Sequence, residues 1–433
     1  MVSSGIMKKS YPRIDETVYS KEISTGLRIY VIPKAGYQKK NAILSVGFGS
    51  INNCFKLAGS NIAQSIPEGV AHFLEHRLFE DENGSVLDRF ASFGAQANAF
   101  TSFSQTAYLF SCTTLFNENL ELLFDLVQKP YFDQMSVDKE IEIIRQEIML
   151  YDDNAHWRIL FNLLSALYHV HPVRNDISGS FESIAQITPE MLYCCYDHFY
   201  NHGNMSLFVT GDIDPHALFN HVEKITGSTV KKAAGRVKGI IPEEPESVHK
   251  KRIEEIKVVS QPQFALGFKD RIAKGTLNGS TLQRELAMEI VLEAIFGSSE
   301  KLYYDLYHED LIGDDFRSEY NVEESFGYSM ITGETGFPDE LYLRVLEAIE
   351  VKQKEGVTEE QFNRYRKNLL GSFISQLNSL DFIMYNYPAY CFRGDDFLSI
   401  PEVLQEIKIE DCNALLRDNL DLSRHSLSLI LPE

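Results

Sequence analysis

The stretch Glu68-Gly-Val-Ala-His72-Phe-Leu-Glu75-His76 decides how the rest of the chain is interpreted. Its pattern predicts a helix over residues 69–78. On a helix, two histidines four residues apart lie on one face, one turn apart, and can share a cation. Glu75 stands next to them, close enough to take a proton from a water bound to that cation. A hydrolytic zinc site uses three protein ligands and keeps one position open for water, so a third ligand must come from elsewhere.

A second predicted helix, over residues 137–151, offers candidates for the third ligand. It carries Glu140, Glu142 and Glu147. A carboxylate suits zinc alongside two imidazoles. Glu140 and Glu147 are seven residues apart and share a face two turns apart, so both can line the site, whereas Glu142 points elsewhere.

The chain repeats itself at a nearly constant offset, which indicates an internal duplication. The offset is 357 − 137 = 220 for one pair of segments, 410 − 190 = 220 for a second and 337 − 116 = 221 for a third. The three pairs are Val137–Glu147 with Val357–Lys367, Ile187–Glu190 with Ile407–Glu410, and Phe116–Leu120 with Phe337–Leu341.

Each half is expected to run through strands, helices, strands, helices and a final strand, which is an α+β class of fold made of two homologous mixed α/β domains. The expected division is an N-terminal domain over 1–226, a linker rich in Lys, Gly, Glu and Pro over 227–254, and a C-terminal domain over 255–433. Within the first half we expect strands at 27–32, 42–48 and 99–113 and further helices at 86–93 and 120–128.

The second half lacks every candidate ligand of the first. Lys367 stands where the offset places Glu147, and no histidine occurs between Arg271 and Tyr307. This joint loss predicts one functional half, which bears the metal, and one scaffold half.

Composition excludes several classes of protein. The 433 residues carry 41 Lys+Arg against 62 Asp+Glu, a net charge of 41 − 62 = −21. This balance disfavours nucleic acid and anionic membranes as partners. No run of about 18 apolar residues is present, and the polar stretch Met1–Tyr11 has no apolar core of a signal peptide. The six cysteines show no CxxC spacing and are expected to be reduced thiols. We therefore expect a cytoplasmic location.

Further motifs give the chain a specific resemblance. With His72–His76 come Asn98-Ala-Phe-Thr101, Glu140 and Glu147, and then Thr106, Tyr108, His171-Pro172, Gly179, Phe199-Tyr200, Asn204-Met205 and Gly211-Asp212. Over nearly its whole length the chain resembles the insulinase, pitrilysin and mitochondrial processing peptidase family of inverted (HxxEH) zinc peptidases. It is most similar to the bacterial short-chain branch. The resemblance implies the LuxS/processing-peptidase-like metallopeptidase fold.

The same resemblance implies roles for individual residues. His72, His76 and Glu147 would bind Zn2+, Glu75 would be the general base, and Glu140 an auxiliary acid close behind the ligands. The strand that carries Asn98, Ala99, Phe100 and Thr101 would bind an extended peptide by β-augmentation. Without the resemblance, this strand would be a plain sheet edge.

The chain departs from the family pattern at one place. Active single-chain and homodimeric members carry an Arg in the second half and, seven residues later, a Tyr that reach the substrate carbonyl. Here Tyr307 and Asp314 stand at those two positions. The resemblance therefore implies a heterodimer with a homologous subunit that lacks HxxEH but carries the pair. The alternative is a monomer or homodimer in which His308 or Arg317 supplies the charge.

The favoured function is that of a zinc endopeptidase subunit acting on peptides or small unfolded segments. A non-catalytic binding or assembly subunit of the same fold is the main alternative. The intact HxxEH and Glu147 argue against it. A metal-dependent amide or ester hydrolase unrelated to peptides is disfavoured by the Asn98–Thr101 signature.

Overall fold

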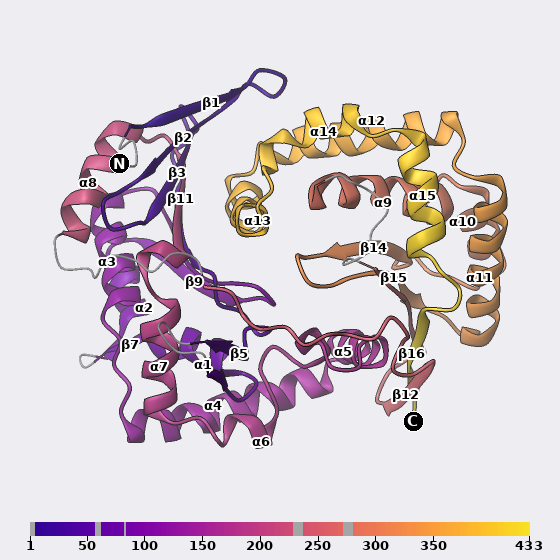
Figure 1. Cartoon of the computed structure of the whole chain (residues 1–433), viewed down its shortest axis with the longest axis horizontal. Coiled ribbons are helices and arrows are strands. Elements are labelled where there is room, and N and C mark those ends of the chain that lie inside the picture. The colour runs from indigo at the N-terminus through magenta and orange to yellow at the C-terminus, as the bar shows by residue number, and fades with distance from the viewer. Residues whose placement is uncertain (1–4, 57–61, 82–83, 228–236, 272–279) are drawn as a thin grey trace. The chain divides into compact units, whose positions relative to one another are not determined.

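The computed structural model describes residues 5–56, 62–81, 84–227, 237–271 and 280–433 (Figure 1). The chain forms two compact units, each assembled from three separate stretches. Unit 1 consists of Met1–Ile148, Asp176–Ile241 and Gln376–Leu398, and unit 2 of Met149–Asn175, Pro242–Ser375 and Ser399–Glu433. Of the expected linker over 227–254, residues 228–236 lie outside the described part.

Unit 1 is built on a seven-stranded sheet in the order β1-β2-β3-β11-β4-β10-β9. Its strands are β1 (Met7–Tyr11), β2 (Glu16–Glu22), β3 (Arg28–Pro33), β4 (Lys40–Val46), β9 (Ala95–Thr101), β10 (Thr106–Cys112) and β11 (Met205–Gly211). β11 runs parallel to β3 and antiparallel to β4, and β9 is an edge strand. Two small hairpins accompany the sheet: β5 (Cys54–Lys56) with β6 (Ala63–Ser65), and β7 (Glu80–Asp81) with β8 (Gly84–Ser85).

Helices cover both faces of this sheet. They are α1 (Val70–Leu78), α2 (Val86–Ser92), α3 (Phe116–Gln128), α4 (Gln134–Asp153), α6 (Phe181–Ile184), α7 (Pro189–Phe199), α8 (Pro215–Thr226) and α13 (Leu380–Arg393). Figure 1 shows α13 on one side of the sheet and α3 and α8 on the other. Alternation along β11 explains this, because Leu207 and Val209 join the core under α1 and α3 while Phe208 packs against Tyr387 of α13. Both faces are therefore buried.

One expected strand is in fact a hairpin. The stretch expected as one strand over 99–113 forms β9 and β10, joined by the short turn Ser102–Gln105. The turn is closed by the backbone N–H of Ser102, which donates to the carbonyl of Gln105 at 2.8 Å. It contains neither glycine nor proline, so the sequence carries no strong turn signal there.

Unit 2 repeats this plan with a five-stranded sheet in the order β12-β16-β13-β15-β14. The strands are β12 (Arg252–Lys257), β13 (Gln263–Lys269), β14 (Arg317–Val322), β15 (Gly327–Glu334) and β16 (His425–Pro432). The helices are α5 (Ala155–Leu167), α9 (Thr281–Phe296), α10 (Lys301–His308), α11 (Pro338–Glu355), α12 (Glu359–Gln376), α14 (Ile400–Glu406) and α15 (Ile409–Asn419). Figure 1 shows α5 and α9 on opposite sides of this sheet.

The two sheets have the same topology. The order β3-β11-β4-β10-β9 in unit 1 corresponds strand by strand to β12-β16-β13-β15-β14 in unit 2. In both, the final strand of the half is parallel to one neighbour and antiparallel to the other. This correspondence, together with the mixed α/β architecture, agrees with the fold class expected from the internal repeat.

The units differ from contiguous halves because each half gives one helix to the other unit. α5, from the first half of the sequence, belongs to unit 2, and α13, from the second half, belongs to unit 1. α5 packs closely against β13 at Gly267, where an added Cβ would lie 2.8 Å from Leu163. The sequence division into 1–226 and 255–433 does not contain this exchange, because helix amphipathicity does not say which sheet a helix covers.

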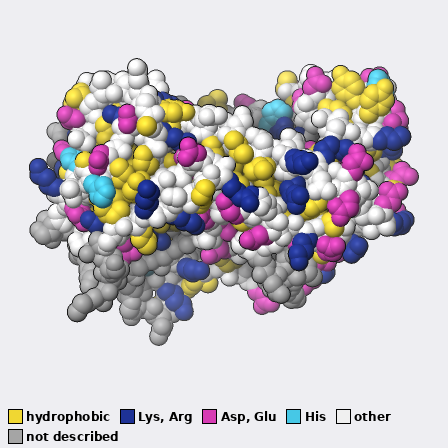
Figure 2. Space-filling model, turned by 90° about the horizontal axis from the view of Figure 1, so that it is seen from above, with side chains coloured by type: hydrophobic (Ala, Val, Ile, Leu, Met, Phe, Trp, Pro, Cys, Tyr) yellow, Lys and Arg dark blue, Asp and Glu magenta, His cyan; other side chains and the backbone are white. Residues whose placement is uncertain are grey.

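Within the described residues, no helix is long and apolar enough to cross a membrane. On the face drawn in Figure 2, basic and acidic side chains are interspersed rather than separated by sign.

Candidate metal centre

The helix α1 that carries both histidines is fixed at its start by two glycines. Gly69 precedes the helix with φ +88°, and a Cβ there would lie 2.5 Å from the carbonyl oxygen of Ser178. Gly179, at φ +78°, would likewise bring a Cβ within 2.7 Å of the carbonyl oxygen of Glu68. Because only glycine allows such an approach with positive φ, these residues set where α1 begins against the loop at 178–179.

The structure brings the three predicted ligands of unit 1 together. His72 Nε2 lies 3.6 Å from Glu147 Oε1, and His76 Nε2 lies 3.3 Å from Glu147 Oε2. One ligand atom from each of the three residues lies within 4.8 Å of the other two. His72 and His76 stand one turn apart on α1, and Glu147 approaches from α4.

This arrangement fits a zinc ion. Two imidazole nitrogens and one carboxylate oxygen are the donors of a hydrolytic zinc site. His76 Nδ1 lies 3.1 Å from Glu140 Oε1, so Nδ1–H can donate to this carboxylate, and the neutral ring would then present the lone pair of Nε2 on the side of Glu147 to a metal ion. The side chains of His76 and Glu147 are 26% and 24% exposed, whereas that of His72 is 9% exposed.

The same contacts govern the charge on His76. Burial lowers the pKa of its imidazole, but the hydrogen bond to Glu140 and the negative charges of Glu147 and Glu140 outweigh burial and leave the pKa raised above its usual value. In the absence of a cation, positive charge on His76 is thus favoured by the carboxylates around it.

Glu75 lies on α1 beside the cluster but outside it. Thr101 Oγ1, at the end of β9, donates a 2.6 Å hydrogen bond to Glu75 Oε2. Burial raises the pKa of the Glu75 carboxyl, partly offset by His72 and by this hydrogen bond. A buried carboxylate with a raised pKa is the kind of group that accepts a proton near neutral pH.

Glu140 is almost fully buried and contacts the cluster at His76, on the side of the ring away from Glu147. Its side chain contacts His76 through one oxygen, and Arg77 Nη1 lies 3.3 Å from the other. Arg77 is a functional candidate that the sequence reasoning missed. The sequence signal that could have identified it is a basic residue directly after the HxxEH motif. In the structure this residue is buried, with 1% of its surface exposed.

The predicted peptide-binding strand is in place at the sheet edge. β9 pairs with β10 on one side, and within the described residues no strand occupies its other side. Asn98 is exposed on it, and Ala99 and Phe100 are half-buried. The Phe100 ring packs against Tyr385 of α13, with ring centroids 5.7 Å apart. Thr101 is the last residue of this strand, and its side chain also contacts Glu75.

In unit 2, Tyr307 and Asp314 occupy an acidic and aromatic surface. Tyr307 lies in the last turn of α10 and is 45% exposed, and its ring is stacked on Tyr303. Burial raises the pKa of Tyr303, and the charges of Asp314 and Asp315 add to that rise. His308 packs against Tyr304 at 4.1 Å between ring centroids. The negative charges of Asp314 and Asp315 therefore act on Tyr303, the stacking partner of Tyr307.

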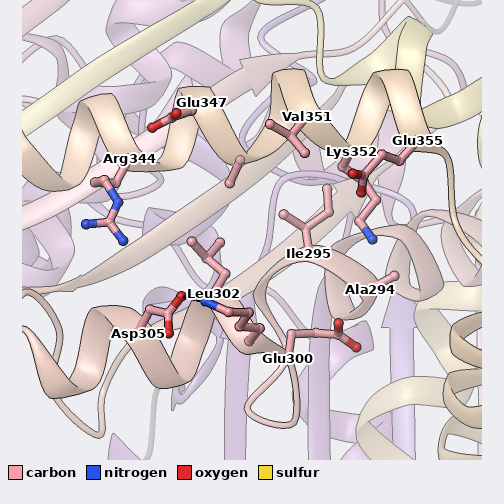
Figure 3. Close-up of a pocket in the computed structure, with 12 residues that line it drawn as sticks. Ala294, Ile295, Glu300, Leu302, Asp305, Arg344, Glu347, Val351, Lys352 and Glu355 are labelled. Atoms are coloured by element: carbon pink, nitrogen blue, oxygen red, sulfur yellow. Dashed lines mark hydrogen bonds and ion pairs between the residues drawn. The ribbon is translucent and has the colours of Figure 1, made fainter.

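A separate cavity of about 510 Å³ lies in unit 2 between α9, α10 and α11. Figure 3 shows Arg344, Glu347 and Lys352 of α11 across from Leu302 and Asp305 of α10. Several of its charged groups already have partners, since Arg344 pairs with Glu309, Lys301 with Asp305, and Lys352 with Gln361. No imidazole or thiol is among the residues that line it, so it does not resemble the cluster in unit 1.

Comparison with known proteins agrees with this geometry. The family model described as Insulinase (Peptidase family M16) matches residues 57–180, and that described as Peptidase M16 inactive domain matches residues 186–369. The uncharacterized zinc protease YmfH of Bacillus subtilis is 38% identical over 98% of both chains. The uncharacterized zinc protease YmxG of the same organism is 27% identical over 86% of this chain and 91% of its own.

Solved structures show the same fold. An M16-like peptidase from Alicyclobacillus acidocaldarius superposes with a TM-score of 0.92 at 32% identity, covering 99% of this chain and 100% of the other. A protease from Helicobacter pylori gives a TM-score of 0.81 at 18% identity, with 96% and 99% covered. The resemblance and the fold class predicted from the sequence are thereby confirmed.

Proposed function

Because the chain belongs to the insulinase (peptidase M16) family, we propose that it is the metal-bearing subunit of a zinc-dependent endopeptidase. The observation that carries this proposal is the convergence of His72, His76 and Glu147, with Glu75 on the same helix as the two histidines. Two relatives carry the name zinc protease, which supports zinc as the metal.

His72, His76 and Glu147 would hold the ion through two Nε2 atoms and one carboxylate. When bound, zinc supplies Lewis acidity, which activates a water and polarises a carbonyl. Glu75 then acts as the general base and takes a proton from the attacking water. Its burial supports this role because a desolvated carboxylate is a stronger base than one in water. Thr101 holds Glu75 in one orientation.

The substrate we propose is an extended peptide or a small unfolded segment. The side of β9 that no strand of the described part of the chain occupies would offer backbone N–H and C=O groups to such a peptide, which would add to the sheet as a further strand. Asn98 and Ala99 would lie along it, and Phe100, fixed against Tyr385, would border it. Thr101 joins this strand to the proton acceptor, so a peptide on β9 would run past Glu75.

The proposed partner is a homologous subunit that carries Arg and Tyr where this chain has Tyr307 and Asp314. A cation and a phenol aimed at the carbonyl oxygen stabilise the charge that develops there, and one such donor contributes about 10²–10³ in rate. Asp314 is exposed and acidic and would oppose that charge. A monomer or homodimer with His308 or Arg317 in this role is the alternative.

A non-catalytic binding or assembly subunit is the second candidate function. The missing Arg/Tyr pair favours it, as does the family model of the inactive domain over 186–369. The complete ligand set argues for catalysis, because a subunit used only for binding has no need of Glu75 beside that set.

The test is the substitution Glu75→Gln. The zinc-loaded variant and the wild type are each mixed with the homologous subunit and assayed on a mixed peptide library. We expect Glu75→Gln to keep zinc and lose at least 10²-fold in hydrolysis, the range for loss of a general base. Glu142→Gln, on exposed α4 surface, is the matched control and keeps full activity. Equal hydrolysis by Glu75→Gln and the wild type would show that the proposed role is wrong.

A further inference from the structure

We propose that Arg77 is a positioning residue of the metal centre, which acts through Glu140 to fix the imidazole of His76. This inference rests on the proposed function, since it concerns how the chain holds zinc. It assigns a role to the basic residue that directly follows the HxxEH motif.

Arg77 is buried deeply for a charged side chain. It is 1% exposed, near the C-terminal end of α1. Its Nη1 lies 2.7 Å from Glu80 Oε2 and 3.3 Å from Glu140 Oε2. Glu80 in turn lies 3.2 Å from Lys139 Nζ at the surface. A guanidinium is buried at this depth only when carboxylates surround it, and here two do.

The two oxygens of Glu140 face different partners. Oε2 is next to Arg77, and Oε1 accepts the hydrogen bond from His76 Nδ1. Glu140 is 4% exposed, so its carboxylate depends on these contacts for compensation of the lost hydration. Arg77 therefore holds Glu140 as a fixed, charged acceptor, and Glu140 fixes the His76 ring with Nε2 directed to Glu147.

Arg77 also balances the charge behind the site. Glu75, Glu140 and Glu147 lie close to the two histidines, and the guanidinium is in contact with one of these carboxylates, that of Glu140. Partners that orient a metal-binding histidine typically change metal affinity by 10- to 100-fold when removed. Arg77 contacts Glu140, the partner of the histidine, rather than the metal ligand His76 itself.

The first experiment measures zinc affinity by competition with a chelator. Arg77→Met, which keeps the length and apolar stem, is expected to weaken zinc binding about tenfold or more. Arg77→Lys keeps the charge and is expected to recover part of that loss. Arg145→Met, which removes an exposed arginine paired with Glu142 on α4, is the matched control and leaves affinity unchanged. Unchanged affinity in Arg77→Met would overturn the inference.

A double-mutant cycle separates positioning from general structural support. If Arg77 acts through Glu140, Arg77→Met added to Glu140→Gln weakens zinc binding by less than twofold beyond Glu140→Gln alone. A full additional loss in the double variant would show that Arg77 acts by another route. Thermal unfolding of the zinc-free proteins checks that each variant folds. If Arg77→Met does not fold, Arg77→Lys and Glu140→Gln carry the test instead. Wild-type zinc affinity in both of these variants would overturn the inference.

The outcomes distinguish this inference from the proposed function. If the wild-type chain binds no zinc, the proposed function fails. If the wild type binds zinc and Glu75→Gln abolishes hydrolysis while Arg77→Met keeps wild-type affinity, the function stands and the role of Arg77 fails.

Discussion

Thr101 Oγ1 donates a 2.6 Å hydrogen bond to Oε2 of Glu75, which links the end of the edge strand β9 to the helix α1. Thr101 is the last residue of the strand proposed to bind substrate, and Glu75 is the proposed base. Under the proposed function, a peptide that adds to β9 would be placed by the same residue that contacts the proton acceptor. We therefore predict that this hydroxyl couples peptide binding to the position of the base.

Thr101→Val should lower kcat while zinc affinity stays at the wild-type value. Valine has nearly the same shape and keeps the strand, but it cannot donate to Glu75. The loss of one hydrogen bond to a charged group corresponds to about tenfold or somewhat more in rate. Thr101→Ser, which retains the hydroxyl, should be close to wild type. Steady-state kinetics of the mixed enzyme provides the measurement, and a Thr101→Val enzyme with wild-type kcat would contradict the coupling.

The protein should bind about one zinc per chain, because two imidazoles and one carboxylate converge at one place in the described residues. Glu147→Gln should weaken binding by an order of magnitude or more, since an amide is a poorer ligand than a carboxylate. Glu142→Gln lies on the same helix α4 with its side chain 66% exposed, and should leave binding unchanged. Elemental analysis after purification with added zinc measures the stoichiometry. A wild-type chain without zinc would exclude the site.

Much of the site was predictable because it is local. The spacing of His72, Glu75 and His76 needs nothing but helix geometry, and the predicted helix over 69–78 is α1, Val70–Leu78. The seven-residue spacing of Glu140 and Glu147 placed both on one helix face, and the choice of Glu147 as the ligand came from the family resemblance. The roles of these residues remain predictions that the experiments above test.

The rest depended on tertiary contacts. The contact between Arg77 and Glu140 joins residues 63 positions apart, and that between Thr101 and Glu75 joins residues 26 apart. The exchange of α5 and α13 between the units could not be predicted either, because the apolar face of a helix does not determine which sheet the helix packs against. The turn between β9 and β10 was missed because Ser102–Gln105 contains no glycine or proline.

Unit 2 should lose stability at acidic pH through Glu244. Its carboxylate is a shared acceptor for the backbone N–H groups of residues 169, 170 and 171 and for Lys269. Burial raises the pKa of Glu244, but these donors outweigh burial and leave the pKa lowered. A lowered folded-state pKa gives stability that is present above the unfolded value of about 4.3 and is lost as pH falls through the folded value.

Glu244→Gln should therefore destabilise the protein at pH 7 by roughly 1.5–3 kcal/mol, the range for hydrogen bonds to a charged group. The difference from the wild type should shrink as pH falls from about 5 to below the folded pKa. Thermal unfolding followed by circular dichroism measures this, with the exposed neighbour Glu243→Gln as control. A difference that stays constant between pH 7 and the acidic end would show that the charge of Glu244 contributes nothing.

The central claim is that this chain supplies the metal and the base of a peptidase whose oxyanion-side groups come from a second polypeptide. The most direct measurement is the turnover of a peptide library by the zinc-loaded chain, first alone and then with the homologous subunit that lacks HxxEH but carries Arg and Tyr seven residues apart. We predict near-inactivity alone and an increase of at least about 10²-fold on mixing, since one missing oxyanion donor accounts for 10²–10³ in rate. Turnover of about one per second or faster by the chain alone, or no hydrolysis on mixing, would contradict the claim.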